Sequence, residues 1–377
     1  MEVTMNKDES LYIAGPNCFW PRGGNTLQAY REFSLYHGFK VALPGDPKPD
    51  EEKAKEKPWD QQTKKERGAN ILKNCADSMD ASTIIIANLD NYRGYSPDGG
   101  TIFEVGMAYA KEAKCYAYTR DIRSTGEKFS GGCWTADELF DEKGRKVPNY
   151  DLPFSVDILG SCKVIEGNYF DALNVVMADI KEESKDKAKR AKAVEKLSVE
   201  PTVKSDKPIV YFCDFDRYSE NAPEKYAEVK ALLEKYGFTA YVPTDPCPGV
   251  EELDCGEDRY AQVYNEFDRY QQHVRNCDII LADLNDFYGY EPNADVSFEC
   301  GMAFQLRKKM YAFMDNIGRM IDRVPNKGEE NGCKDINDMG VENFDAPVNL
   351  MFGSSFKFLD GSMEDVVRKM AEDLKAE

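Results

Sequence analysis

Residues 83–89 read TIIIANL, and residues 278–284 read DIILADL. Both runs are almost continuously apolar, which is typical of a strand buried on both faces of a parallel sheet. A helix-like stretch precedes each run, at residues 70–79 and 265–274, and a glycine-containing loop with a further helix follows it. The two runs therefore predict the central strands of two similar α/β sheets.

The chain repeats itself along most of its length. YIAGPNCF, starting at Tyr12, corresponds to YFCDFD, starting at Tyr211, and the same offset of 199 positions relates Gly38 to Gly237. Further along, an offset of 195 relates IIIANLDNYRGYSP to IILADLNDFYGYEP and TIFEVGMAYA to VSFECGMAFQ. Such internal similarity indicates a duplicated domain, and we call the two parts copy 1 and copy 2.

Each copy has the same predicted order of elements: strand, helix, strand, helix, strand, helix, strand. This order predicts the α/β class, with two tandem Rossmann- or flavodoxin-like domains, each a parallel sheet flanked by helices. In such sheets, ligands bind beyond the carboxyl ends of the strands. The loops at residues 15–26 and 90–101 are expected there.

A charged stretch rich in Lys, Glu and Ala separates the copies and ends at prolines. This composition is typical of a helix end followed by a solvated linker. We expect a first domain at residues 1–195, a linker at 196–206 and a second domain at 207–377.

The overall composition excludes several classes of protein. The chain has 377 residues and a formal net charge of -19, so DNA or RNA polymers are not expected partners. Its apolar runs are too short to cross a bilayer, and its polar N-terminus does not resemble a signal peptide. Eleven cysteines without a CxxC pair indicate free thiols in a reducing compartment, and a cytoplasmic location is expected.

The chain contains only two histidines, His37 and His273, and both are expected to be structural or on the surface. Histidine-based triads and metal sites are therefore disfavoured. Acid–base or nucleophilic chemistry must come from carboxylates, Tyr, Cys or Lys.

The strongest local signal is DNYRGYSPDGGTIFEVGMAYA, at residues 90–110. The segment from Pro97 to Gly100 predicts a turn, after which Thr101 lies near a helix N-terminus and Glu104 lies in or beside the first turn of that helix. A helix N-terminus favours an ionised carboxylate, and Asp98 lies six residues earlier on the same loop. Two carboxylates with different tasks suit glycosyl transfer through an oxocarbenium-like transition state. The alternative is an ordinary acidic N-terminal turn.

YIAGP, ANLDNYRG and PDGGTIFEVGMAYA together resemble the nucleoside 2-deoxyribosyltransferase family, over most of residues 10–180 and more weakly over 209–375. The resemblance implies that Glu104 is the nucleophile, that Asp98 contacts the base and that Tyr12 positions Glu104.

The resemblance also implies residues that bind the substrate. In copy 1 these are Gly15, Asn74, Asp90 and Gly100. Active sites of the family borrow a PVNLM segment from a neighbouring subunit, and copy 2 carries this segment with Asn349 and Met351. Copy 1 has the poorer match FSVDIL at residues 154–159.

Copy 2 departs from the family pattern. Tyr211 and Glu299 correspond to Tyr12 and Glu104, but Asn293 stands where copy 1 has Asp98. Copy 2 is therefore expected to be degenerate or altered in base preference. We expect one chain to be a pseudo-dimer in which copy 2 completes the site of copy 1, and three chains could then form a pseudo-hexameric homo-oligomer.

The resemblance implies exchange of the nucleobase of a 2′-deoxynucleoside in nucleotide salvage, through a covalent glycosyl-Glu104 intermediate. Nucleosides and free nucleobases are the expected partners, and the chemistry needs no metal or organic cofactor. Two alternatives stay open: a nucleoside or nucleotide N-glycoside hydrolase, and a nucleotide-sensing module that binds without turnover. The segment Arg22–Gly24 is expected to be a flexible loop, with a phosphate contact as the alternative.

Overall fold

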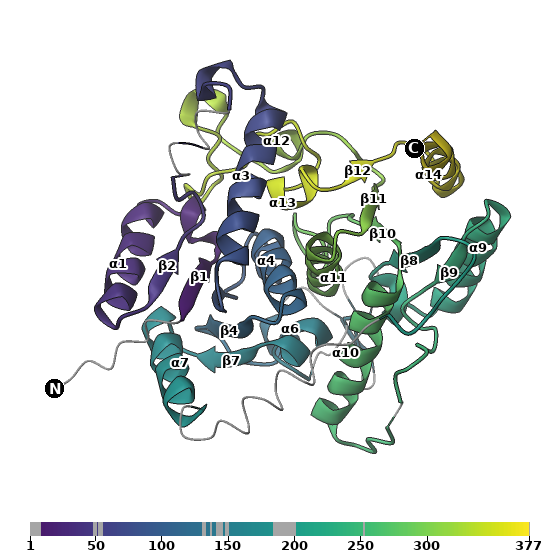
Figure 1. The fold of residues 1–377 in the computed structure, drawn as a ribbon, viewed down its shortest axis with the longest axis horizontal. Coiled ribbons are helices and arrows are strands. Elements are labelled where there is room, and N and C mark those ends of the chain that lie inside the picture. Colours follow the sequence, from purple (N-terminus) through teal and green to yellow (C-terminus); the bar gives the residue numbers. More distant parts are fainter. Residues whose placement is uncertain are drawn as a thin grey trace.

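The structure is a computed structural model. It describes residues 9–47, 51, 56–129, 133–135, 138–140, 146–147, 151–183, 201–251 and 253–376. Figure 1 shows the two copies packed against each other, with copy 1 in purple to teal and copy 2 in green to yellow.

Copy 1 contains a five-stranded sheet with the strand order β2-β1-β3-β4-β7, in which every pairing is parallel. Its strands are β1 (Ser10–Ala14), β2 (Lys40–Ala42), β3 (Ile84–Asn88), β4 (Lys114–Thr119) and β7 (Lys163–Glu166). The strand order reverses between β1 and β3, and such a reversal opens a crevice at the carboxyl ends of the two strands.

Copy 2 repeats this order as β9-β8-β10-β11-β12, again with parallel pairings. Its strands are β8 (Ile209–Cys213), β9 (Thr239–Tyr241), β10 (Ile279–Asp283), β11 (Lys309–Phe313) and β12 (Lys357–Phe358). The predicted fold class is therefore confirmed. The expectation from sequence lacked a fifth strand in each copy, because β7 and β12 are only four and two residues long.

Helices cover both faces of each sheet, as the continuous apolar strands require. In copy 1, α1 and α7 pack on one face and α3 and α4 on the other; in copy 2, α9 and α14 take the place of α1 and α7, and α10 and α11 that of α3 and α4. These helices are α1 (Gly23–Tyr36), α3 (Lys64–Asp80), α4 (Gly99–Ala110), α7 (Tyr169–Glu183), α9 (Ala222–Lys235), α10 (Arg259–Asn276), α11 (Ala294–Gln305) and α14 (Met363–Ala376).

The two copies meet where α4 crosses α11. A Cβ atom added at Gly106 would lie 2.1 Å from the carbonyl oxygen of Phe298, and one added at Gly301 would lie 1.9 Å from that of Phe103. Both glycines are therefore needed for the helices to approach so closely. One apolar core runs through this crossing and contains buried residues of both copies.

Each copy also contributes a short helix that packs against the other copy. The helix α6 (Val156–Ser161) of copy 1 packs against α10 and α11, whereas α13 (Leu350–Gly353) of copy 2 packs against α3 and α4. This exchange brings residues near position 350 to the helix that carries Glu104.

Further short elements are η1 (Pro16–Phe19), η2 (Trp59–Gln61), α5 (Thr125–Lys128), β5 (Cys133–Thr135), β6 (Glu138–Phe140), η3 (Asp216–Tyr218), α12 (Met320–Arg323) and η4 (Glu329–Asn331).

The predicted domain limits at residues 195 and 207 stay a prediction. The last element of copy 1 ends at Glu183 and the first of copy 2 begins at Ile209, while residues 184–200 lie outside the described part of the chain.

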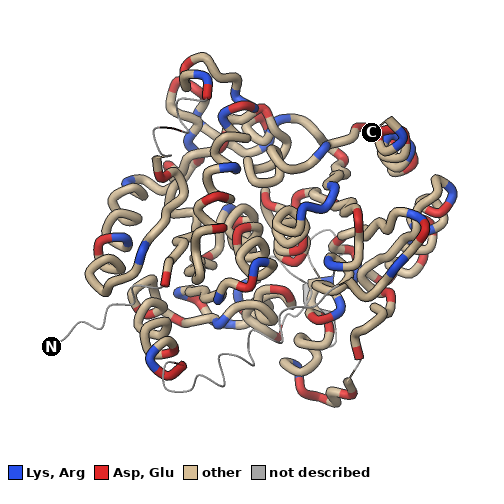
Figure 2. Tube along the Cα trace, in the orientation of Figure 1, with Lys and Arg blue, Asp and Glu red and all other residues tan. Residues whose placement is uncertain are grey.

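Figure 2 shows acidic residues spread over both copies. Within the described ranges, no helix combines the length and the apolar character needed to span a membrane.

Candidate active site

A cavity of about 530 Å³ lies between the two copies. Copy 1 lines it from the end of β1, from α3 and from the start of α4, and copy 2 lines it with the segment before α13 and with α13 itself. Its volume is in the range of sites that hold small organic ligands. The lining residues are Gly15, Cys18, Phe19, Pro44, Gly45, Ile71, Cys75, Asp98, Gly100, Thr101, Glu104, Gly332, Cys333, Gly340, Val341, Glu342, Asn343, Phe344, Asn349, Leu350 and Met351.

The buried carboxyl of Glu104 lines this cavity and contacts Tyr12. The Tyr12 hydroxyl donates a hydrogen bond of 2.5 Å to Oε1 of Glu104. Tyr12 is fully buried in β1, so the sheet holds its hydroxyl in place. The structure therefore brings together two of the residues that the sequence singles out.

The helix α4 begins at Gly99, so Glu104 lies in its second turn, beside the first, where the favourable effect of the helix N-terminus is weaker. Burial raises the pKa of Glu104 to about 8, and the hydrogen bond from Tyr12 opposes this shift. Desolvation disfavours a charged carboxylate, so Glu104 binds its proton more tightly than an exposed glutamate does.

Asp98 is the N-cap residue of α4. Its Oδ2 accepts hydrogen bonds from the backbone N–H of Thr101 at 2.8 Å and from the Thr101 hydroxyl at 2.6 Å. Burial raises the pKa of Asp98, although the bonds from Thr101 act in the opposite direction. The cavity thus contains two buried carboxyl groups on one helix start, and both favour the protonated form.

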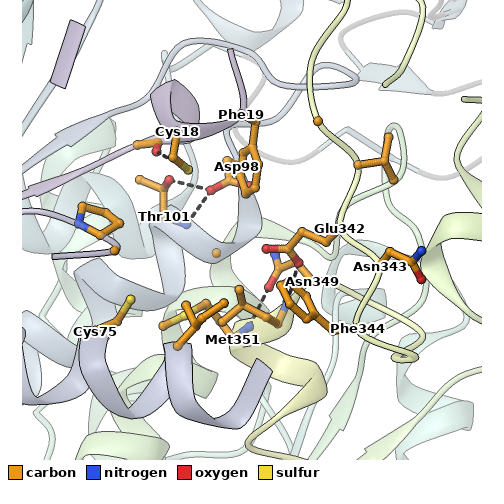
Figure 3. A pocket seen from close by; sticks show the side chains of 18 of the residues that line it. Cys18, Phe19, Cys75, Asp98, Thr101, Glu342, Asn343, Phe344, Asn349 and Met351 are labelled. Atoms are coloured by element: carbon orange, nitrogen blue, oxygen red, sulfur yellow. Dashed lines mark hydrogen bonds between the residues drawn. The ribbon is translucent and has the colours of Figure 1, made fainter. Parts of the chain in front are cut away.

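The cavity also contains Asn349 and Met351 of copy 2. Asn349 caps α13, because its Oδ1 accepts from the N–H of Met351 at 3.1 Å. Its Nδ2 donates to Oε2 of Glu291 at 3.3 Å, and the same oxygen accepts from the N–H of Gly99 at 3.3 Å. Glu291 thereby couples the Asn349 side chain to the start of α4 (Figure 3 shows the lining residues).

Two of the predicted glycines leave room for their neighbours. Gly15 has a φ of 154°, and a Cβ atom there would lie 2.6 Å from Oδ1 of Asn17 and 2.8 Å from Cβ of Asn88. A Cβ atom at Gly100 would lie 3.2 Å from Nδ2 of Asn349. A side chain at either position would displace residues at the edge of the cavity.

Asn74 and Asp90 do not line the cavity. Asn74 donates from Nδ2 to the backbone oxygen of Asp46 at 2.8 Å, so it holds the loop after β2. Asp90 accepts from Arg120, from its N–H at 2.9 Å and its Nε at 2.7 Å, and so ties the loop after β3 to the end of β4. On α3, the neighbouring Cys75 lines the cavity instead, because a step of one residue turns a helix by about 100°.

The sequence did not reveal a second segment of copy 2, at residues 332–344, that also lines the cavity. Arg93 of copy 1 holds this segment: its Nε lies 3.1 Å from Oδ2 of Asp335, and its Nη2 donates to the backbone oxygen of Gly340 at 2.5 Å. Glu342 follows two residues later and lines the cavity. No local pattern could signal these contacts, since they join positions more than 240 apart.

In copy 2, the residue that corresponds to Glu104 is Glu299, and it forms an ion pair. Nη1 and Nη2 of Arg217 both lie 3.0 Å from Oε1 of the buried Glu299. Arg217 stands where copy 1 has Cys18, so a large cation replaces a residue that lines the copy 1 cavity. The Tyr211 hydroxyl has no hydrogen-bond partner among the described residues, unlike that of Tyr12.

Residues of both copies lie near the start of α11. Asn293 caps α11 by accepting from the N–H groups of Asp295 and Val296. Asp157, from α6 of copy 1, is fully buried, and its N–H donates to Oδ1 of Asp295 at 2.9 Å. Burial raises the pKa of Asp157 well above its usual range. In copy 2, Glu299 is thus paired with Arg217, Asn293 caps α11, and Tyr211 is fully buried.

The copy 1 cavity contains carboxyls but no lysine or arginine among the described residues that line it. The segment Arg22–Gly24 is not part of its lining, and Gly23 and Gly24 form the first turn of α1 rather than a flexible loop. Across the described ranges, no group of three or more His, Cys, Asp and Glu side chains has the geometry of a metal site.

A family model agrees with this duplicated architecture. The model of the nucleoside 2-deoxyribosyltransferase family matches the chain twice, over residues 11–156 and 210–351. Among solved structures, a 2-desoxiribosyltransferase from Leishmania mexicana is 25% identical over 44% of this chain and 97% of its own, with a TM-score of 0.33. A search of functionally curated proteins gives no match. The two family matches cover both copies, and the chain belongs to the nucleoside 2-deoxyribosyltransferase family as a tandem duplication of its domain.

Proposed function

We propose that the chain transfers the 2-deoxyribosyl group of a nucleoside from one nucleobase to another, through a covalent intermediate on Glu104. The observation that carries this proposal is the Tyr12–Glu104 hydrogen bond of 2.5 Å inside a cavity that also contains Asp98. Once Glu104 is ionised, it is a positioned carboxylate beside a second, protonated carboxyl, which is the arrangement that nucleophilic glycosyl transfer uses.

In the first half of the reaction, an ionised Glu104 oxygen attacks C1′ of the deoxyribose. The C1′–N bond breaks, its electron pair goes to the base, and Asp98 gives its proton to the departing base. The hydrogen bond from Tyr12 favours the ionised form of Glu104, whereas burial favours the neutral form of Asp98. The products are a Glu104–C1′ ester, a neutral base and an ionised Asp98.

In the second half, a nitrogen of the incoming base attacks C1′. The ester bond breaks, its electron pair returns to Glu104, and the N–H proton of the incoming base goes to Asp98. Both carboxyls then regain their starting states. If water attacks instead, the same residues carry out hydrolysis, which is the alternative enzyme activity.

The charge of the cavity favours nucleosides over nucleotides. Asp98, Glu104 and Glu342 line it, and a substrate phosphate would meet these acids without a compensating cation among the described lining residues. A buried phosphate without a paired cation is costly, because desolvation penalises an uncompensated charge. We therefore assign an unphosphorylated 2′-deoxynucleoside and a free base as substrates.

We further infer that the chain works as a covalent pseudo-dimer, with domains at residues 1–195 and 207–377. The reciprocal packing of α6 and α13 supports this inference, as do Asn349 and Met351 in the cavity of copy 1. Once two copies are fused, each can lose the half of the site that it no longer uses. Three such chains would reproduce a six-domain assembly.

The test is to incubate the chain with a 2′-deoxynucleoside, with and without a second free base, and to separate the products by chromatography. Exchange predicts a new deoxynucleoside that forms only when the second base is present. Free deoxyribose at the same rate with and without the base would identify a hydrolase. Binding without any product would identify a sensing module and would contradict the proposal.

A further inference from the structure

Glu291 is a buried carboxyl of copy 2 that the exchange mechanism does not use. Its side chain is not among those that line the cavity, and the residue is only 2% exposed. Its Oε2 accepts two hydrogen bonds of 3.3 Å, one from the N–H of Gly99 and one from Nδ2 of Asn349. A single oxygen of copy 2 therefore joins the helix that carries Glu104 to a side chain that lines the cavity.

The duplicated chain shows that this carboxyl is particular to copy 2. Ser96 occupies the corresponding position of copy 1, at the offset of 195. Both loops form the same backbone turn: the N–H of Tyr92 donates to the oxygen of Ser96 at 2.9 Å, and that of Phe287 donates to the oxygen of Glu291 at 2.8 Å. The copies thus share the turn and differ in the side chain, and a serine is too short to bridge two groups as Glu291 does.

The bond to Glu291 fixes the direction of the Asn349 amide. Oδ1 of Asn349 accepts from the N–H of Met351, and Glu291 takes one of the two N–H groups on Nδ2. Turning the amide over would set its nitrogen against the N–H of Met351, and two donors cannot bond each other. The second N–H of Nδ2 is then the group that Asn349 offers to a ligand in the cavity.

Glu291 also completes the start of α4. Asp98 caps this helix through Thr101, while Glu291 satisfies the N–H of Gly99, the first residue of the helix. A buried N–H without a partner would cost stability. The carboxyl packs closely here, because a Cβ atom at Gly99 would lie 3.0 Å from Oε2 of Glu291. The place of Asn349 relative to the catalytic helix is therefore set by Glu291.

We propose that Glu291 is a positioning residue that acts from copy 2 on the copy 1 active site. It holds the Asn349 amide so that an N–H donor faces the substrate, at a fixed place relative to α4. This inference rests on the proposed cleavage of the N-glycosidic bond, and it holds for either transfer or hydrolysis. Glu291 acts through Asn349 and does not itself touch the substrate.

The experiment compares two substitutions of Glu291 that keep a polar side chain. Glu291→Gln keeps the length and an accepting oxygen, and it is a close replacement because burial raises the pKa of Glu291 well above its usual range and favours the neutral form. Glu291→Asp is one methylene shorter, which is too short to hold both bonds. Ser96→Ala, at the equivalent position of copy 1, is the matched control. Each is made in the full chain, alone and together with Asn349→Ser.

Steady-state rates on a 2′-deoxynucleoside and thermal unfolding are measured for every variant. Glu291→Asp should lower kcat/KM about tenfold, whereas Glu291→Gln and Ser96→Ala should stay within about threefold of the unmodified chain. In the Asn349→Ser background, Glu291→Asp should cost little further activity, because the amide that it positions is already gone. The lower melting temperature caused by losing the Gly99 bond should instead appear in both backgrounds.

Three results would overturn the inference. One is an equal loss of kcat/KM from Glu291→Asp with and without the Asn349 amide, which would mean that Glu291 does not act through Asn349. The others are unchanged kcat/KM in Glu291→Asp and a loss in Glu291→Gln as large as that in Glu291→Asp. If the unmodified chain cleaves no 2′-deoxynucleoside, the proposed function itself is rejected, and the role of Glu291 in it is rejected as well.

Discussion

The hydroxyl of Tyr12 and Oε1 of Glu104 lie 2.5 Å apart, although 92 positions separate the two residues in the sequence. Tyr12 comes from the sheet and Glu104 from the helix that packs on it, so the fold itself sets the direction of the carboxyl. The Tyr12 bond lowers the pKa of Glu104 while burial raises it. The balance between these two effects decides when Glu104 is ionised.

Replacing Tyr12 with phenylalanine tests that balance. Glu104 must lose its proton to act as the nucleophile, so kcat/KM should rise with pH as the carboxyl, whose pKa burial raises to about 8, ionises. Loss of the hydrogen bond removes an effect that lowers this pKa. The acid limb of the pH profile should therefore move to higher pH, by about one unit. A limb that stays in place or moves to lower pH would show that Tyr12 does not control the ionisation.

Glu104 and Glu299 form a matched pair for testing the nucleophile. Glu104→Gln should leave the fold intact and lower the exchange rate by about 10⁴-fold or more, as the loss of a nucleophile does. Glu299→Gln should keep the rate of the folded protein but lower the melting temperature, because it leaves Arg217 buried without its carboxylate. Steady-state rates and thermal unfolding measure both effects. A rate above a tenth of wild type in Glu104→Gln would reject Glu104 as the nucleophile.

Asp98→Asn separates the acid role of Asp98 from its capping role. Copy 2 shows that asparagine can cap this helix, since Asn293 accepts from two N–H groups of α11. An amide cannot give a proton to the base, so kcat should fall about 10²- to 10³-fold with little change in KM. Circular dichroism and thermal unfolding check that the helix is retained. Unchanged turnover on every deoxynucleoside would exclude an acid role for Asp98.

The composite site predicts that Asn349 matters to catalysis in copy 1. Asn349→Ala loses the cap of α13 as well as the amide, so it is expected to cost about 1 kcal/mol of stability besides activity. Asn349→Ser keeps a side-chain acceptor for the cap and removes only the amide. We expect both variants to lower kcat/KM at least about tenfold.

Two outcomes would contradict this composite site. One is an Asn349→Ser protein with unchanged kcat/KM in the same assay. The other is full activity in a chain truncated to residues 1–195, which lacks every lining residue that copy 2 supplies.

Features of the site that depend on short stretches of sequence could be predicted, while side-chain directions could not. The turn before α4 and the start of that helix near Thr101 follow from local preferences of the backbone. Asn74 was expected in the site and Cys75 is there instead, because the rotation of α3 about its axis is set by packing on the sheet. Asp90 was also expected in the site, but its carboxylate accepts a hydrogen bond from Arg120 instead.

The sequence by itself determined the duplicated α/β architecture, because apolar strands and amphipathic helices are encoded within short segments that repeat at offsets of 199 and 195 positions. Only the tertiary structure decided that Glu342 enters the cavity, that Arg93 fastens the segment before α13, and that Arg217 occupies the position beside Glu299. It also decided that Glu104 holds its proton more tightly than an exposed acid. Contacts and desolvation of this kind depend on which distant segments pack together, and no local pattern encodes them.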